Sequence, residues 1–342
     1  MTSFKSYHRE LYHGGDLDAA ILVYGGTADT WLDLSTGINP VPYPVPSVPP
    51  SLWNRLPESG SETALLEASR HYYEIPEGMG VTACPGTQSA IQILPTLFEP
   101  CDVAILSPTY AEHRHCWQTH GHTILEVTRP EDIPPDCSII ILVSPNNPTG
   151  WMPEAELLLS LQQQARDRNG LLVVDEAFMD CTPDKSCLPR PSADHLVVLK
   201  SFGKFFGLAG LRLGFAIGDP NITGEINKRL GPWAVSGPAS YIGEKALSDS
   251  QWISKTRQRL TQDRAACHQL LTENELVPLG GTDLFTLVQY DQADPLFRHL
   301  CEHQILSRPF PDHPSLIRFG HPASEEDRAR LSAALNQFRI IS

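Results

Sequence analysis

Seven short apolar runs define the middle of the chain, from about Glu62 onward. They alternate with helix-like spacers and are, in order, VTACP, DVAILSP, HTILEV, SIIILVSP, LLVVDEAF, HLVVLKSF and RLGFAIG. Their near-continuous hydrophobicity is typical of strands that are buried on both faces. Alternation of such strands with helices predicts an α/β domain built on a mostly parallel, seven-stranded sheet.

Helical patterns accompany these runs. The segment ETALLEASRHYY begins at Glu62, and residues 153–170 predict a crossover helix with proline near its start and glycine after its end. After about Ser236 strand-like and helix-like segments no longer alternate regularly. Helices are expected near residues 241–271 and 324–338, with strand candidates LFTLVQY and SLIRFGHP between them. This order is α+β in character and indicates a second, smaller domain.

The first forty-odd residues show no regular period and are expected to be irregular. They end in NPVPYPVPSVPP at residues 39–50, where dense proline favours extended backbone. We interpret this cluster as a segment that crosses between domains. The prediction is therefore a large domain over residues 46–235, and a small domain made from residues 1–45 and 236–342.

Charge and composition exclude several classes of function. The 342 residues carry a formal net charge of −14, which disfavours nucleic acids and anionic membranes as partners. The longest apolar runs, such as SIIILV, have the length of a strand and are too short to span a bilayer. MTSFKSYHRE at the N-terminus lacks a secretory apolar run, and the eight cysteines show no C-x-x-C spacing. We therefore expect a cytoplasmic protein with reduced thiols.

Functional groups follow five of the predicted strands, at the edge where α/β sheets bind ligands. They are Gly86-Thr87-Gln88, Tyr110, Asn146-Asn147, Asp175, and Ser201 with Lys204. The set suits pyridoxal phosphate. A carboxylate can keep the pyridine nitrogen protonated, a lysine can form an imine, and an aromatic ring can stack on the cofactor. A glycine-led helix start can bind the phosphate.

A metal site is the competing interpretation for one region. His113, His115, Cys116, His120 and His122 lie within ten residues. They have no second ligand pair at the spacing of a structural zinc site, and they follow Tyr110 on an expected helix and turn. We therefore expect a polar, partly buried helix and no metal.

The stretch SFGKFFGLAGLRLGF, residues 201–215, resembles the cofactor-lysine signature of class I and II aminotransferases. That resemblance implies the pyridoxal-phosphate-dependent transferase fold of type I, with Lys204 forming the imine. It assigns Ser201 and Arg212, which lie at the family's spacings from this lysine, to the cofactor phosphate. The same spacing excludes Lys200 as the imine-forming lysine.

Other motifs of the same resemblance occur in the expected order. SPNNPTG makes Asn147 the partner of the ring hydroxyl and a neighbour of the substrate, and VVDEAF places Asp175 at the pyridine nitrogen as a catalytic residue beside Lys204. Tyr110 falls at the stacking position. In SLIRFGHP, Arg318 matches the arginine that binds the substrate carboxylate. For the cofactor phosphate, the resemblance adds the loop Gly86, Thr87 and Gln88.

Two positions depart from the family pattern. Phe178 stands three residues after Asp175, where relatives often have tyrosine, and Leu56 stands in an R-L-P context where relatives often have R-Y-P. Two hydroxyl donors are thereby missing. We predict that the pKa of the lysine–cofactor imine is less depressed than in typical aminotransferases.

The N-terminal segment indicates a branch of the family. YHGGDL and LDLSTGINP resemble the threonine-phosphate decarboxylases of cobalamin biosynthesis. This resemblance implies that His13, Gly14 and Gly15 hold the phosphate of a phosphorylated amino acid, that Asn39 lies near its carboxylate, and that the chain forms a homodimer. It implies decarboxylation of L-threonine O-3-phosphate. The alternative is an aminotransferase for histidinol phosphate or a related amino acid, while a DNA-binding regulator is disfavoured because no basic helix-turn-helix precedes residue 60.

Overall fold

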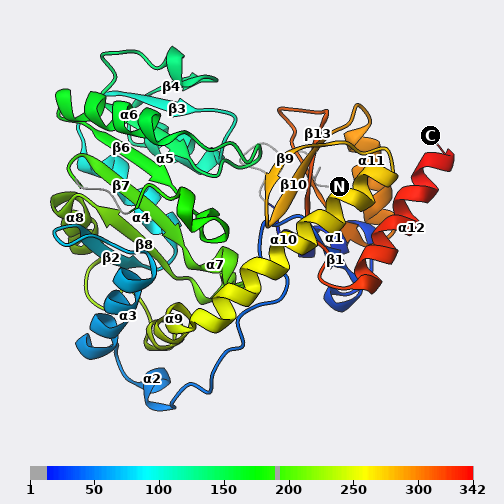
Figure 1. Cartoon of the computed structure of the whole chain (residues 1–342), viewed down its shortest axis with the longest axis horizontal. Coiled ribbons are helices and arrows are strands. Elements are labelled where there is room, and N and C mark those ends of the chain that lie inside the picture. The colour runs from blue at the N-terminus through cyan, green and yellow to red at the C-terminus, as the bar shows by residue number, and fades with distance from the viewer. Residues whose placement is uncertain (1–13, 189–192, 342) are drawn as a thin grey trace, which may run out of the picture. The chain divides into compact units, whose positions relative to one another are not determined.

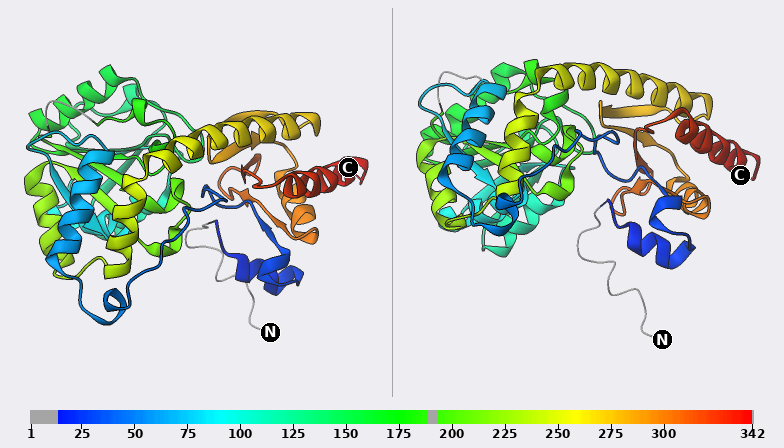
Figure 2. Two further views of the ribbon diagram at one scale, coloured as in Figure 1. Left: turned by 60° about the horizontal axis from the view of Figure 1, so that its bottom comes forward. Right: turned by 90° about the horizontal axis from the view of Figure 1, so that it is seen from below.

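The computed structural model describes residues 14–188 and 193–341 (Figure 1). It divides into a larger unit, Pro42–Lys255, and a smaller unit made from Met1–Val41 and Thr256–Ser342. The first boundary lies close to the predicted 45/46. The second lies at 255/256 and not at the predicted 235/236, because helix α9 (Gly237–Ser248) belongs to the larger unit. It packs beside α3 (Ser59–Tyr72), as both views in Figure 2 show.

The larger unit is built on the predicted seven-stranded sheet. Its strands are β2 (Gly80–Cys84), β3 (Asp102–Leu106), β4 (Thr123–Val127), β5 (Ile139–Val143), β6 (Leu171–Asp175), β7 (Leu196–Ser201) and β8 (Gly214–Gly218). Their order is β2-β8-β7-β6-β5-β3-β4. Strand β8 runs antiparallel to both of its neighbours, and the other pairings are parallel. The predicted α/β class, with a mostly parallel sheet, is confirmed.

The central strands form because their residues are apolar on both faces. Every residue of β5 and β6 is buried, so neither face of the sheet meets water there. The remaining helices of this unit are α2 (Ser51–Asn54), α4 (Thr87–Ile93), α5 (Ala111–Thr119), α6 (Ala155–Asp167), α7 (Phe202–Phe205) and α8 (Pro220–Leu230). Helix α6 lies within the predicted crossover helix of residues 153–170 and buries Leu158, Leu161 and Ala165.

Strand register brings distant functional segments to one sheet edge. Gly214, at the start of β8, lies opposite both Cys84 at the end of β2 and Ser201 at the end of β7. Because β8 is antiparallel, the residues just before it lie at the carboxyl ends of its neighbours. Asp175, at the end of β6, is paired with Leu199 of β7. This arrangement gathers the strand-end residues that the sequence predicts.

The smaller unit is α+β, as predicted. An antiparallel sheet has the order β12-β13-β10-β9, and a second pair joins β1 to β11 in parallel. The strands are β1 (Leu32–Asp33), β9 (Pro278–Thr282), β10 (Phe285–Gln289), β11 (Ile305–Leu306), β12 (Arg308–Pro309) and β13 (Leu316–Gly320). Its helices include α11 (Ala293–Glu302) and α12 (Glu325–Ile341), which lie side by side (Figure 2). Helix α10 (Ser250–Glu273) contains the unit boundary.

A helix lies where the sequence predicts irregular structure. Helix α1 spans Leu17–Tyr24, with the Asp16 side chain accepting from the Ala19 N–H at its start and Gly25 (φ 81°) at its end. Ala20 packs with Trp31, and the Trp31 ring N–H donates to the Gly25 carbonyl at 3.0 Å. The run LDAAILVY has no clear helical period, so the cap and this packing stabilise the helix. Within the described residues, no helix combines the length and apolar character needed to cross a bilayer.

Candidate active site

Lys204 lies on a helical turn that is anchored by aromatic packing. Phe202, Phe205 and Phe206 are at most 1% exposed, and the rings of Phe202 and Phe206 stack with centroids 4.4 Å apart. The Phe206 ring also stacks on Trp252 at 5.6 Å. In the sequence SFGKFFG these phenylalanines face the core, and Lys204 is left partly accessible. Its Nζ lies 5.6 Å from the centre of the Phe178 ring.

The neighbouring Lys200 has a different environment. Its Nζ lies 2.5 Å from Oε2 of Glu176 and 3.2 Å from the hydroxyl of Ser186, and the Lys200 and Glu176 side chains are 3% and 1% exposed. The Glu176 carboxylate also accepts from the Ser186 hydroxyl and the Cys187 N–H. Lys200 is therefore held in a buried ion pair between β6 and β7. This ion pair engages the Lys200 amine, and Lys204 as the reactive lysine stays a prediction.

Asp175 is held by a histidine that the sequence interpretation did not place in the site. Nε2 of His113 lies 3.0 Å from Oδ2 of Asp175, and both side chains are buried. The other carboxylate oxygen accepts from the Ala177 N–H at 3.0 Å. His113 lies on the first turn of α5. A buried carboxylate with such fixed donors is suited to hold a positively charged ring nitrogen.

Gly86 and Arg212, both predicted to bind the cofactor phosphate, lie in close contact. Gly86 has φ +79°, and a Cβ atom there would lie 2.4 Å from Nη2 of Arg212. At Gly214, a Cβ atom would lie 2.7 Å from the backbone nitrogen of Thr87. Both positions therefore need glycine, and the Arg212 guanidinium lies against the start of α4. Helix-start N–H groups beside a guanidinium are suited to bind a phosphate group.

Two adjacent asparagines in the loop after β5 have different roles. The Asn146 amide accepts from the Thr109 hydroxyl at 2.7 Å and donates to the Pro108 carbonyl at 2.9 Å, so Asn146 holds the loop in place. Asn147 is 7% exposed and follows directly. It lies beyond the carboxyl end of β5, and its contact with the cofactor stays a prediction.

Gln88 and Tyr110 lie together at the starts of α4 and α5. The Tyr110 hydroxyl donates to Oε1 of Gln88 at 3.3 Å, and the Gln88 amide nitrogen donates to Oε2 of Glu112. The Gln88 side chain is thus engaged with protein partners at both ends. Any phosphate contact from Gln88 would therefore come from its backbone N–H, and Glu112 is a further residue that the sequence did not indicate.

In the smaller unit, Arg318 lies directly opposite a second arginine. Arg308 on β12 and Arg318 on β13 are paired across the antiparallel ladder. Arg318 is 2% exposed and donates to the Ser35 carbonyl at 2.8 Å. Burial, and then the charge of Arg308, hold its pKa well below the ordinary arginine value. Like charges in this position are unfavourable in isolation and would be stabilised by an anion. Arg308 was missed because its strand has only two residues.

Of the predicted substrate residues in the N-terminal segment, Gly14 lies close to Arg308. A Cβ atom at Gly14 would lie 2.3 Å from the Ser35 carbonyl oxygen and 3.5 Å from Cδ of Arg308. The Gly15 N–H donates to the Ser35 hydroxyl at 2.7 Å. Asn39 is buried, and its Oδ1 accepts from Arg259 and from the Val41 N–H. His13, the remaining predicted residue of this segment, lies outside the described residues.

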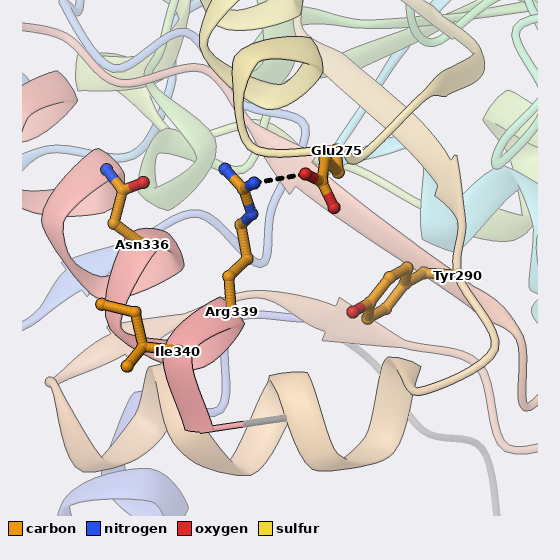
Figure 3. Close-up of a pocket in the computed structure, with 5 residues that line it drawn as sticks. All are labelled: Glu275, Tyr290, Asn336, Arg339 and Ile340. Carbon is orange, nitrogen blue, oxygen red and sulfur yellow. Dashed lines mark hydrogen bonds and ion pairs between the residues drawn. The ribbon is translucent and has the colours of Figure 1, made fainter.

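The smaller unit has two pockets of interest. One, of about 440 Å³, is lined by Gly14, Gly15, Asp33, Asn39 and His321 among others, and so holds predicted substrate residues. The other is lined by Glu275, Tyr290, Asn336, Arg339 and Ile340, and contains an Arg339–Glu275 ion pair (Figure 3). It holds none of the predicted residues. In the part of the chain that the structure describes, no group of three His, Cys, Asp or Glu side chains is placed to hold a metal ion.

Comparison with known proteins assigns the family. The sequence pattern of "Aminotransferase class I and II" matches residues 50–335. The chain belongs to the class I and II aminotransferase family. A threonine-phosphate decarboxylase from Pseudomonas aeruginosa is 41% identical over 331 residues, which cover 96% of this chain and 98% of that protein. Another, from a Sinorhizobium species, is 38% identical over 334 residues, with coverage of 96% and 99%.

A solved structure of the aminotransferase family shares the fold. The histidinol-phosphate aminotransferase from Sinorhizobium meliloti, determined in complex with pyridoxal-5'-phosphate, has a TM-score of 0.81 to this chain. It is 18% identical and covers 100% of this chain and 99% of that one. The family pattern begins at residue 50, so Gly14, Gly15 and Asn39 lie outside it.

Proposed function

We propose that this protein is a pyridoxal-phosphate-dependent carboxy-lyase that converts L-threonine O-3-phosphate to (R)-1-amino-2-propanol O-2-phosphate and CO2. The observation that carries this proposal is identity of 41% and 38%, over 96% of the chain, to two threonine-phosphate decarboxylases. The resemblance of the N-terminal segment supports the same conclusion. The product of the proposed reaction is the aminopropanol phosphate that this resemblance assigns to cobalamin biosynthesis.

The larger unit has residues that fit pyridoxal phosphate. Gly86 leaves space for the Arg212 guanidinium beside the backbone nitrogen of Thr87, and these groups would hold the phosphate. Asp175, fixed by His113, would hold the ring nitrogen. When bound, pyridoxal phosphate supplies an electron sink for the bond that breaks at Cα.

Further residues of this unit complete the cofactor set. We assign Ser201 to the phosphate, Asn147 to the ring hydroxyl, and Tyr110 to stacking against the ring. Lys204 would carry the cofactor and, after the substrate amine has displaced it, hold a proton at Nζ. The aromatic packing of α7 fixes the backbone of Lys204, so only the side chain needs to move.

The smaller unit supports a substrate with two anionic groups. Arg318 and Arg308 are opposed across two strands, and a Cβ at Gly14 would meet Cδ of Arg308. L-Threonine O-3-phosphate has a carboxylate and a phosphate. We assign the carboxylate to Arg318, with Asn39 nearby, and the phosphate to the segment of His13, Gly14 and Gly15.

The proposed reaction is a decarboxylation with a simple balance. The Cα–carboxylate bond breaks, the carboxylate leaves as CO2, and one proton is added at Cα, for which Lys204 is the proposed donor. The same residues would serve transamination of histidinol phosphate or a related amino acid, in which the Cα–H bond breaks instead. Near-full-length identity to the decarboxylases favours the first reaction.

Two further properties belong to the proposal. A homodimer is supported by Trp53 and Leu56, which are 69% and 63% exposed on and beside α2, since neighbouring exposed apolar groups are typical of interfaces. A cytoplasmic location is supported by the eight cysteines, all of which are free thiols.

The test uses purified protein loaded with pyridoxal phosphate. It is incubated with L-threonine O-3-phosphate in the absence of any oxo acid, and CO2 and the amine product are followed by mass. We expect both products in equal amounts from the wild type. Arg318→Leu should lose activity while retaining the cofactor, and Arg298→Leu, at an exposed ion pair, should not. Glutamate formed only after 2-oxoglutarate is added would make the protein an aminotransferase and overturn the proposal.

A further inference from the structure

Gln88 connects the starts of two helices that carry proposed cofactor residues. It is the second residue of α4, directly after Gly86 and Thr87. Its amide nitrogen donates to Oε2 of Glu112, on the first turn of α5, and its amide oxygen accepts from the hydroxyl of Tyr110, which immediately precedes α5. The chain of contacts therefore runs from Glu112 through Gln88 to Tyr110.

The carboxylate of Glu112 determines which way the Gln88 amide points. An ionised carboxylate only accepts hydrogen bonds, so it selects the NH2 end of the amide as its partner. The carbonyl end of Gln88 then faces Tyr110, whose hydroxyl must act as the donor. With an apolar residue at position 112, the Gln88 amide could take either orientation. The Tyr110 hydroxyl would then no longer be fixed as the donor to the Gln88 oxygen.

Burial of the Glu112 carboxylate has a desolvation cost that a surface glutamate does not have. Glu112 is 9% exposed, and its Oε2 also accepts weakly from the Cys116 thiol at 3.8 Å, one turn later on α5. Burial, and then the Glu112 charge, raise the pKa of the Cys116 thiol to about 11, so Cys116 stays protonated and acts as a donor. Buried carboxylates require such partners. The start of a helix also favours the negative charge.

The same helical turn holds the histidine that fixes Asp175. His113 follows Glu112 directly and contacts Asp175, and its ring lies edge-on to the Tyr110 ring with centroids 6.1 Å apart. Displacement of the first turn of α5 would therefore move Tyr110 and His113 together. The Gln88–Glu112 hydrogen bond ties that turn to α4, where the phosphate loop begins.

We propose that Glu112 is a positioning residue that acts through Gln88 to hold the ring of Tyr110 against the cofactor. This inference rests on the proposed function, because Tyr110 is assigned to stacking there. Glu112 itself touches neither cofactor nor substrate in this account. Its effect is transmitted by two hydrogen bonds, and each link can be removed separately.

The test compares cofactor-loaded Glu112→Leu, Gln88→Leu and Tyr110→Phe with the wild type. The readouts are the visible circular dichroism of the bound cofactor, which reports its asymmetric environment, and kcat and KM for decarboxylation. Each single variant should show the same altered dichroism and lose about 3- to 10-fold in kcat/KM, the loss expected for one hydrogen bond. The double variant Glu112→Leu/Tyr110→Phe should be no worse than either single variant.

Two controls keep the outcome clear. Glu112→Gln keeps the side-chain length and a carbonyl that can accept from Gln88, so it should lose less than Glu112→Leu, and it keeps the test available if Glu112→Leu does not fold. His115→Leu, at an exposed position on the same helix, should change nothing. Wild-type dichroism and kinetics in Tyr110→Phe and Gln88→Leu, or additive losses in the double variant, would overturn the proposal. If the wild type bound the cofactor without releasing CO2, the proposed function would fail, and the dichroism would still test the relay.

Discussion

His113 and Asp175 form a buried contact across 62 positions of sequence, with 3.0 Å between Nε2 and Oδ2. The carboxylate belongs to the last residue of β6, and the imidazole comes from the first turn of α5. Because His113 and the Ala177 N–H each take one carboxylate oxygen, Asp175 has little freedom to rotate. We infer that His113 aims Asp175 at the ring nitrogen of the cofactor.

Removal of the imidazole should weaken catalysis without abolishing it. In His113→Leu, Asp175 loses one of its fixed donors and is held less well against the ring nitrogen. We expect kcat to fall by about 10- to 100-fold, the range seen when an orienting partner is lost. Asp175→Asn, which removes the charge itself, should lose more. Steady-state kinetics of both variants test this order, and an equal or larger loss in His113→Leu would contradict it.

Gly86→Ala should weaken cofactor binding more than it weakens the fold. The new methyl group would lie 2.4 Å from Nη2 of Arg212 and would push the guanidinium away. The positive φ adds roughly 1 kcal/mol of strain. We expect the Kd for pyridoxal phosphate to rise by about 10-fold, since loss of one charged hydrogen bond is of that size. Gly60→Ala is the matched control, because nothing lies within 4 Å of its Cβ and it should leave the Kd unchanged.

The buried Lys200–Glu176 ion pair should contribute more to the free energy of unfolding than an exposed ion pair does. Lys200→Met leaves the Glu176 carboxylate buried without its countercharge, which costs about 3–5 kcal/mol. Lys228→Met, in an exposed pair with Glu225, should cost less than about 1 kcal/mol. Urea unfolding of the two variants measures the difference. Similar losses in both would show that the buried pair contributes little.

His321 should make stability depend on pH in the acidic range. Burial lowers its pKa to about 3, so the folded protein holds it neutral, with its ring between Thr286 and the Asp283 carbonyl. Its contribution is complete above the ordinary pKa of 6.5 and is lost as pH falls from there toward 3. The loss is up to about 1.4 kcal/mol per pH unit.

His321→Asn removes this titration and should show a flatter dependence than the wild type. Urea unfolding between pH 7.5 and pH 4.5 compares the two slopes. Parallel slopes would mean that His321 is not held neutral in the folded protein.

Much of the larger unit could be predicted because its strands carry local signals. The continuous apolar runs identify β2 to β8, and the residues after them are the ones that the sheet gathers, such as Asp175 and Lys204. The roles of His113 and Glu112 could not be predicted, because their partners are 62 and 24 positions away. His113 lies in a histidine-rich run, and that pattern indicates at most a metal site.

The smaller unit was less predictable because its decisive contacts are not local. Helix α1 depends on its Asp16 cap and on packing against Trp31, and Arg308 lies opposite Arg318 only once two strands have paired. The boundary within α10 could not be predicted, because the preceding helix α9 is held by packing on α3. The effect of Phe178 and Leu56 on the pKa of the lysine–cofactor imine stays a prediction.

The most direct test of the account is the fate of the hydrogen at Cα when the cofactor-loaded protein acts on L-threonine O-3-phosphate in D2O. Decarboxylation predicts one CO2 per turnover and an amine product that keeps the original Cα hydrogen and gains one deuterium at the same carbon, measured by NMR and mass. Loss of the original Cα hydrogen, with an oxo acid formed and no CO2 released, would contradict the central claim.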